Sequence, residues 1–113
     1  MANPTIDLAT FRQLQETTGA EFVSELVGAF LEEAPGMLDD LRNAFTARDA
    51  DRFKRAAHSI KSNANTFGAL ALGTLARELE LGGLDAGRQP GALERLDEAY
   101  AHAAAALTER RDG

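Results

Sequence analysis

Apolar residues recur at helical spacing along almost the whole chain. The clearest stripe has alternating steps of four and three residues and consists of Phe53, Ala57, Ile60, Ala64 and Phe67. Side chains with this spacing lie on one face of an α-helix. The pattern therefore predicts a helix over residues 51–66 that buries this face, with Gly68 ending it or permitting a tight corner.

The same periodicity predicts four further helices. The first spans residues 8–17, with Asp7 as its cap, Gly19 as its stop and an apolar edge that includes Ile6 and Phe11. The second spans residues 20–47. Its apolar phase runs through Pro35, which indicates one kinked helix, our preferred interpretation, or two nearly collinear ones. Asp49 or Asp51 can cap the helix over 51–66.

The C-terminal half contains the other two predicted helices. One spans residues 69–81, and a glycine-rich connection over 82–89 follows it. Pro90 suits the first turn of the last helix, and residues 110–113 are expected to be a frayed tail. The last helix has its own stripe: Leu93, Leu96, Tyr100, Ala103 and Leu107.

Composition agrees with an all-α fold, because alanine and leucine dominate and no alternating β-branched run is present. Four long amphipathic helices with short connections predict an antiparallel up-down-up-down four-helix bundle, with the short N-terminal helix covering one end. The length of 113 residues suggests a single domain over residues 1–113.

Several classes of protein are disfavoured by composition. The chain has no cysteine and two histidines far apart, which argues against disulfides and zinc sites. No apolar run approaches the ~20 residues that span a bilayer, and the N-terminus lacks the features of a signal peptide. A cytoplasmic protein is therefore expected. The net charge of −6 argues against nucleic acid as a partner.

Charge is unevenly distributed along the chain. Residues 49–67 carry four basic and two acidic side chains, so this segment is net positive while the segments on both sides are net negative. A local positive patch can steer an anionic partner surface. The same residues could also serve only solubility.

His58 lies off the apolar stripe of its helix. At about 100° per residue it falls roughly 140° from the centre of the stripe, on the same side as Lys54, Lys61, Ser62 and Asn65. An exposed, neutral imidazole is a nucleophile. His102 also lies off an apolar stripe, but no motif surrounds it, and we expect an ordinary surface residue.

The segment that begins at His58 resembles the signature of the histidine phosphotransfer (HPt) family. The matching residues are His58, Ile60, Lys61, Ser62, Phe67 and Gly68, followed by Leu72, Leu75, Leu79 and Glu80. One departure is Ser62, where many family members have glycine. Its hydroxyl could donate a hydrogen bond to a phosphoryl oxygen, or it could be a solvated helix hydroxyl.

The resemblance implies a mechanism and a set of roles. His58 would carry a phosphoryl group on Nε2, Lys61 would stabilise the charge of that group, and Glu80 would orient the imidazole. The chain lacks a nucleotide-binding loop, so we expect a carrier without kinase activity or cofactors of its own. The implied partners are receiver domains of a hybrid histidine kinase and of a response regulator, which supply the aspartate and Mg²⁺.

The docking face is expected around His58, with a small, transient interface and a monomeric chain. Its candidate residues are Lys54, Arg55, Ser62, Asn65, Phe11 and Phe22. The two phenylalanines could equally cover the end of the bundle. The alternative function is a docking module that binds or sequesters a receiver without being phosphorylated.

Overall fold

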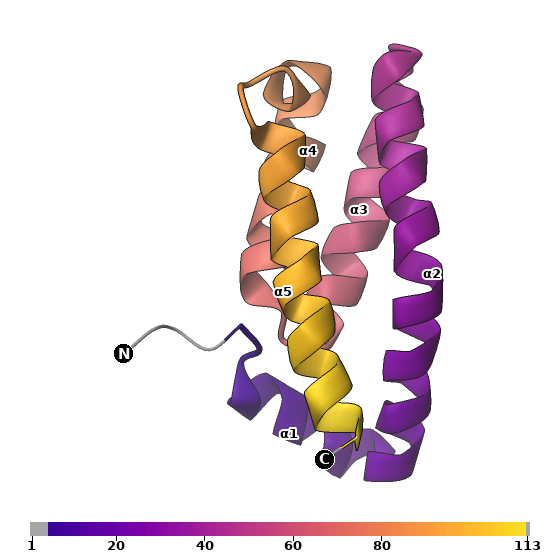
Figure 1. The fold of residues 1–113 in the computed structure, drawn as a ribbon, viewed down its shortest axis with the longest axis vertical. Helices are drawn as coiled ribbons and strands as arrows, with labels where there is room; N and C mark the ends of the chain where they lie inside the picture. The colour runs from indigo at the N-terminus through magenta and orange to yellow at the C-terminus, as the bar shows by residue number, and fades with distance from the viewer. Residues whose placement is uncertain (1–4, 113) are drawn as a thin grey trace.

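The computed structural model describes residues 5–112, and over this part of the chain it is all α-helical. The five helices are α1 (Leu8–Thr18), α2 (Ala20–Thr46), α3 (Ala50–Thr66), α4 (Leu70–Gly87) and α5 (Ala92–Asp112). In Figure 1 the four long helices run along the longest axis as an antiparallel bundle, and α1 lies across one end. The predicted fold class is confirmed.

Two aspartates begin helices as the sequence predicts. The carboxylate of Asp7 accepts a hydrogen bond from the backbone N–H of Thr10 at 3.2 Å, which caps α1. Asp49, rather than Asp51, caps α3 by accepting from the N–H of Arg52 at 3.1 Å. These bonds satisfy donors that the first turn of a helix leaves unpaired.

Helix α2 continues through Pro35 as one element from Ala20 to Thr46. Its apolar side remains in phase on both sides of the proline, with Phe30, Ala34 and Leu41 all buried. Burial of one uninterrupted face compensates for the hydrogen bond that a proline cannot donate.

Helix α4 extends beyond the predicted end at Leu81. The backbone leaves helical geometry at Gly83 (φ 65°, ψ −150°), and residues 84–87 then form another helical turn, so the prediction of a loop over 82–89 was wrong. The burial of Gly87 shows that this turn packs against the bundle. A Cβ on Gly87 would lie 2.9 Å from ring atoms of Phe45 and 3.0 Å from Phe53.

Helix α5 begins and ends later than predicted. Pro90 precedes its first residue, Ala92, instead of lying in its first turn. The prediction of a frayed tail was also wrong for residues 110–112, which are helical, while Gly113 lies outside the described residues. The end of α5 packs on α2, where a Cβ on Gly28 would lie 3.4 Å from the guanidinium of Arg111.

The core is apolar and receives side chains from all four long helices. No polar or charged residue of the described chain is buried. The largest fully buried side chains are Phe53, Leu41, Leu72, Leu96, Leu107, Val23 and Val27. Phe30 links three helices by contacting the rings of Phe67 and Tyr100 at centroid distances of 5.5 and 6.0 Å.

The N-terminal helix is attached to the corner between α3 and α4. The N–H of Asp7 donates to the carbonyl of Gly68 at 2.8 Å, and Ile6 and Phe11 are buried. Gly68 has φ 82°, and a Cβ there would lie 2.8 Å from the carbonyl oxygen of Asp7. The corner therefore needs glycine for its backbone conformation and for the close approach of the N-terminal segment.

Candidate functional site

His58 projects from the middle of α3 into solvent. Its side chain is 58% exposed, whereas the neighbouring core positions Ala57 and Ile60 are buried. The apolar stripe of α3 therefore sets the direction in which His58 points.

Glu80 of α4 holds one nitrogen of this imidazole. Nδ1 of His58 lies 2.7 Å from Oε2 of Glu80, across 22 residues of sequence. A carboxylate accepts hydrogen bonds, so the bond requires a proton on Nδ1. In the neutral imidazole, Nε2 then carries the lone pair, which makes it the nucleophilic nitrogen.

Lys61 binds the other oxygen of the same carboxylate. Its Nζ donates to Oε1 of Glu80 at 2.7 Å, and both side chains are about one quarter exposed. His58 and Lys61 are three residues apart on α3, so both reach one acceptor on the adjacent helix. The ammonium group has three N–H donors, and this bond uses one of them.

These two bonds affect the ionisation of Glu80. The hydrogen bond from Lys61, and then that from His58, lower the pKa of the carboxyl group below its ordinary value of 4.5, while partial desolvation opposes the shift. Glu80 is therefore ionised at neutral pH and presents a negative charge to both partners.

Close contact between α3 and α4 positions this group of side chains. Gly73 is buried, and a Cβ on it would overlap the side-chain amide of Asn65. At the other end, a Cβ on Gly83 would lie 3.6 Å from the side chain of Lys54. The pairing of Asn65 with Gly73 was not predicted from the sequence, although a glycine inside an amphipathic helix signals such close approach.

The predicted docking residues of α3 share the exposed face with His58. Lys54, Arg55, Ser62 and Asn65 are all exposed. Arg77 of α4 is also exposed and lies one turn before Glu80. The face around the imidazole is therefore rich in basic and small polar side chains.

Phe11 and Phe22 differ from this group. Phe11 is 4% exposed and belongs to the core, so its predicted place on the docking surface was wrong. It is buried because α1 packs on the end of the bundle, and the removal of this ring from water stabilises that packing. Phe22 is 50% exposed but lies far along the bundle from His58. Phe30 of α2 contacts Phe67 at the end of α3, so these two residues lie at the same height in the bundle. Phe22 lies eight residues from Phe30 in one direction, and His58 lies nine residues from Phe67 in the other. At 1.5 Å per residue, Phe22 and His58 are therefore about 25 Å apart along the bundle.

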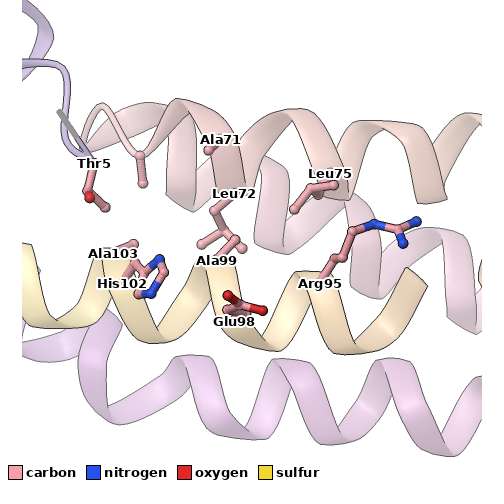
Figure 2. Close-up of a pocket in the computed structure, with 10 residues that line it drawn as sticks. Thr5, Ala71, Leu72, Leu75, Arg95, Glu98, Ala99, His102 and Ala103 are labelled. Carbon is pink, nitrogen blue, oxygen red and sulfur yellow. The ribbon is translucent and has the colours of Figure 1, made fainter. Parts of the chain in front are cut away.

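His102 lines a different feature, a hollow of about 440 Å³ between α4 and α5. Figure 2 shows that His102 and Glu98 line this hollow from α5, and that Leu72 and Leu75 line it from α4. Leu75 lies about 140° around α4 from Glu80, which places this hollow away from the His58 site.

Two further properties concern the described residues as a whole. Within residues 5–112, no group of three or more His, Cys, Asp or Glu side chains is arranged to hold a metal ion. None of the helices in this range has both the length and the apolar character needed to cross a membrane.

Comparison with known proteins defines the class to which this bundle belongs. The sequence profile of the Hpt domain family matches residues 25–109, a range that includes His58, Lys61 and Glu80. The chain belongs to this family and is a histidine phosphotransfer domain of the phosphorelay type. The resemblance of the segment that begins at His58 is thereby confirmed.

Two known proteins illustrate the relationship. Histidine-containing phosphotransfer protein B (HptB) from Pseudomonas aeruginosa PAO1 superposes with a TM-score of 0.84 and 25% identity, over 98% of this chain and 97% of that one. Sensor protein TorS of Escherichia coli K12 is 28% identical over 76 residues, which cover 67% of this chain. The match spans only 8% of the length of TorS.

Proposed function

We propose that the chain carries a phosphoryl group on Nε2 of His58 between two receiver domains. The donor is the phosphorylated aspartate of a hybrid histidine kinase, and the acceptor is the aspartate of a response regulator. The similarity to part of a protein named as a sensor supports a sensor protein as the donor.

The observation that carries this proposal is the geometry of Glu80. Its carboxylate accepts a hydrogen bond from Nδ1 of His58 at 2.7 Å, and the imidazole is otherwise largely exposed. A histidine nucleophile needs one nitrogen with a lone pair, a defined orientation and access for the partner. This arrangement supplies all three with no proton to remove from Nε2.

The transfer is a displacement at phosphorus. The lone pair of Nε2 forms the N–P bond while the P–O bond to the receiver's aspartate breaks, and the aspartate leaves as a carboxylate. The positive charge that develops on the imidazole faces ionised Glu80. Lys61 has further N–H donors that can bind phosphoryl oxygens during transfer. The reverse displacement passes the group to the second receiver.

The remaining components of the reaction come from the partners. We propose that Mg²⁺ is bound by the receiver domain and that the chain acts as a monomeric carrier without kinase activity. Phosphoryl transfer depends mainly on positioning and on charge stabilisation. In the carrier, the oriented imidazole of His58 contributes to positioning, and the ammonium group of Lys61 contributes to charge stabilisation.

The test is direct phosphorylation by receivers. Receiver domains encoded in the same genome are charged with acetyl phosphate and Mg²⁺ and incubated with the chain. We expect acid-labile, base-stable phosphate on His58, located by mass spectrometry. His58→Gln should remove it with only a small change in the thermal midpoint, because the side chain is largely exposed and lies outside the core.

His102→Gln is the matched control, since it changes an exposed histidine elsewhere. It should leave phosphorylation intact. Receivers that bind the wild-type chain but never phosphorylate it would support a docking module instead. Phosphate that persists in His58→Gln would show that another residue is the acceptor.

A further inference from the structure

Three large apolar side chains of the described chain are prominently exposed. They are Phe22 (50%), Leu70 (47%) and Leu81 (66%). Exposed apolar groups are normal when scattered singly, so their position relative to the reactive histidine decides whether they have a role.

Leu81 and Leu70 lie on the exposed face of α4 that adjoins the His58 surface, about 100° and 80° around the helix from Glu80. Gly73 and Glu80 define the side next to α3 through their closeness to Asn65 and His58. At about 100° per residue, both leucines are rotated from the buried position Ala76 in the same direction as Glu80 and Gly73, but further. Leu75 lies in the opposite direction, toward the hollow with His102.

The three side chains lie at different distances from the imidazole. Leu81 directly follows Glu80, whose carboxylate contacts His58, so it lies at the level of the reactive nitrogen. Leu70 precedes Glu80 by ten residues, or about 15 Å of helix. Phe22 is about 25 Å away along the bundle.

Charge on the same face indicates the chemistry of the partner. Lys54, Arg55 and Arg77 are exposed within about two helical turns of His58, and Asp51 is the acidic exception on this side of α3. A partner that docks here needs an acidic surface with an apolar group near its centre. A receiver must bring its aspartate and the acidic groups of its metal pocket to His58, which matches the basic side chains on this face.

We infer that Leu81 is the central apolar contact for receiver domains, that Leu70 lies at the margin of the interface, and that Phe22 lies outside it. This inference rests on the proposed function. A transient interface of about 1,200 Å² in total covers roughly 600 Å² on each partner, which is a disc of roughly 14 Å radius. Measured along the bundle from His58, such a disc covers the level of Leu81, ends close to the level of Leu70 and excludes that of Phe22.

The experiment compares Leu81→Ser, Leu70→Ser and Phe22→Ser, with the receiver domain that phosphorylates the wild-type chain as the probe. Binding is measured by titration calorimetry, and transfer is measured at saturating receiver. Leu81→Ser should weaken receiver binding about tenfold, the size expected for one leucine that becomes buried on association. Leu70→Ser should have a smaller effect, and Phe22→Ser none.

Leu81→Met provides the conservative control, because it keeps the apolar area and should restore affinity. All variants should keep the thermal midpoint, since the replaced side chains are largely exposed. Transfer at saturating receiver should stay within about twofold of wild type for Leu81→Ser, which separates docking from the chemistry at Glu80.

Other results would overturn the inference. Normal transfer by the wild-type chain together with unchanged affinity in Leu81→Ser would refute the role of Leu81 and leave the proposed function standing. Self-association that only Leu81→Ser abolishes, with receiver affinity intact, would assign this side chain to a second copy of the chain. A wild-type chain that no receiver phosphorylates would refute the proposed function itself, and with it this docking role.

Discussion

Lys61 donates to Oε1 of Glu80 at 2.7 Å, on the carboxylate whose other oxygen binds His58. The residue that orients the imidazole and the residue proposed to stabilise the phosphoryl group are therefore coupled. Changing Glu80 alters the surroundings of both His58 and Lys61, so substitutions at these positions should have non-additive effects on transfer.

Lys61→Ala should slow transfer while leaving the fold and receiver affinity nearly unchanged. The ammonium group is expected to bind phosphoryl oxygens most strongly when negative charge develops, so its loss acts on the rate. A charged hydrogen bond contributes roughly 1.5–3 kcal/mol, which corresponds to a decrease of about 10- to 100-fold. Rapid-quench measurement at saturating receiver gives the rate, and equal rates for both proteins would exclude Lys61 from the mechanism.

Glu80→Gln should change how stability depends on pH. Because the folded-state pKa of Glu80 lies below its ordinary value of 4.5, its ionisation contributes stability above pH 4.5, and this contribution is lost as pH falls through the folded pKa. The wild-type chain should therefore melt at a higher temperature than Glu80→Gln at pH 7. The gap should narrow as the pH is lowered below 4.5. Calorimetric melting curves from pH 7 to pH 3 test this, and a constant gap would contradict it.

Ser62→Trp should block receiver docking by steric hindrance. Ser62 is exposed and lies one turn from His58, so an indole there would fill the approach to the imidazole. Ala105→Trp on α5 is the matched control, because that exposed position is on a helix away from α3. Both variants should stay folded. NMR titration with a receiver should show amide shifts over residues 54–65 that only Ser62→Trp loses, and shifts centred on His102 would place the interface elsewhere.

Gly68→Ala should destabilise the bundle by at least about 1–2 kcal/mol. The left-handed φ of 82° disfavours a side chain, and the added Cβ would lie 2.8 Å from the carbonyl oxygen of Asp7. Gly36→Ala on α2 is the control, because a Cβ there meets nothing within 4 Å and helix propensity favours alanine by up to about 1 kcal/mol. Urea unfolding of both variants should therefore give shifts of opposite sign.

Local sequence pattern was sufficient to predict the helices and the direction of His58. The stripe from Phe53 to Phe67 implies one buried face, and His58 must then point outward. The start of α1 at Asp7 could be predicted for the same reason, because capping depends on residues within one turn.

Features that depend on contacts between helices could not be predicted from the local sequence pattern. Residues 84–87 are helical because Gly87 packs under Phe45 and Phe53, and Phe11 is buried because α1 folds onto the end of the bundle. Local periodicity puts Phe11 on the apolar edge of its helix but does not identify what that edge packs against, and it gives no sign of the contact at Gly87. The glycine content of residues 82–89 even favoured a loop.

The sequence by itself determined that this protein is a helical bundle with an exposed histidine, since hydrophobic periodicity and motif spacing are local properties. Only the tertiary structure decided that Glu80 bridges His58 and Lys61, that the exposed Leu81 lies at the level of the imidazole and that Phe11 is buried in the core. These relationships depend on how α3 and α4 are rotated and aligned against each other. Packing between residues of the two helices, such as Asn65 over Gly73, sets that alignment.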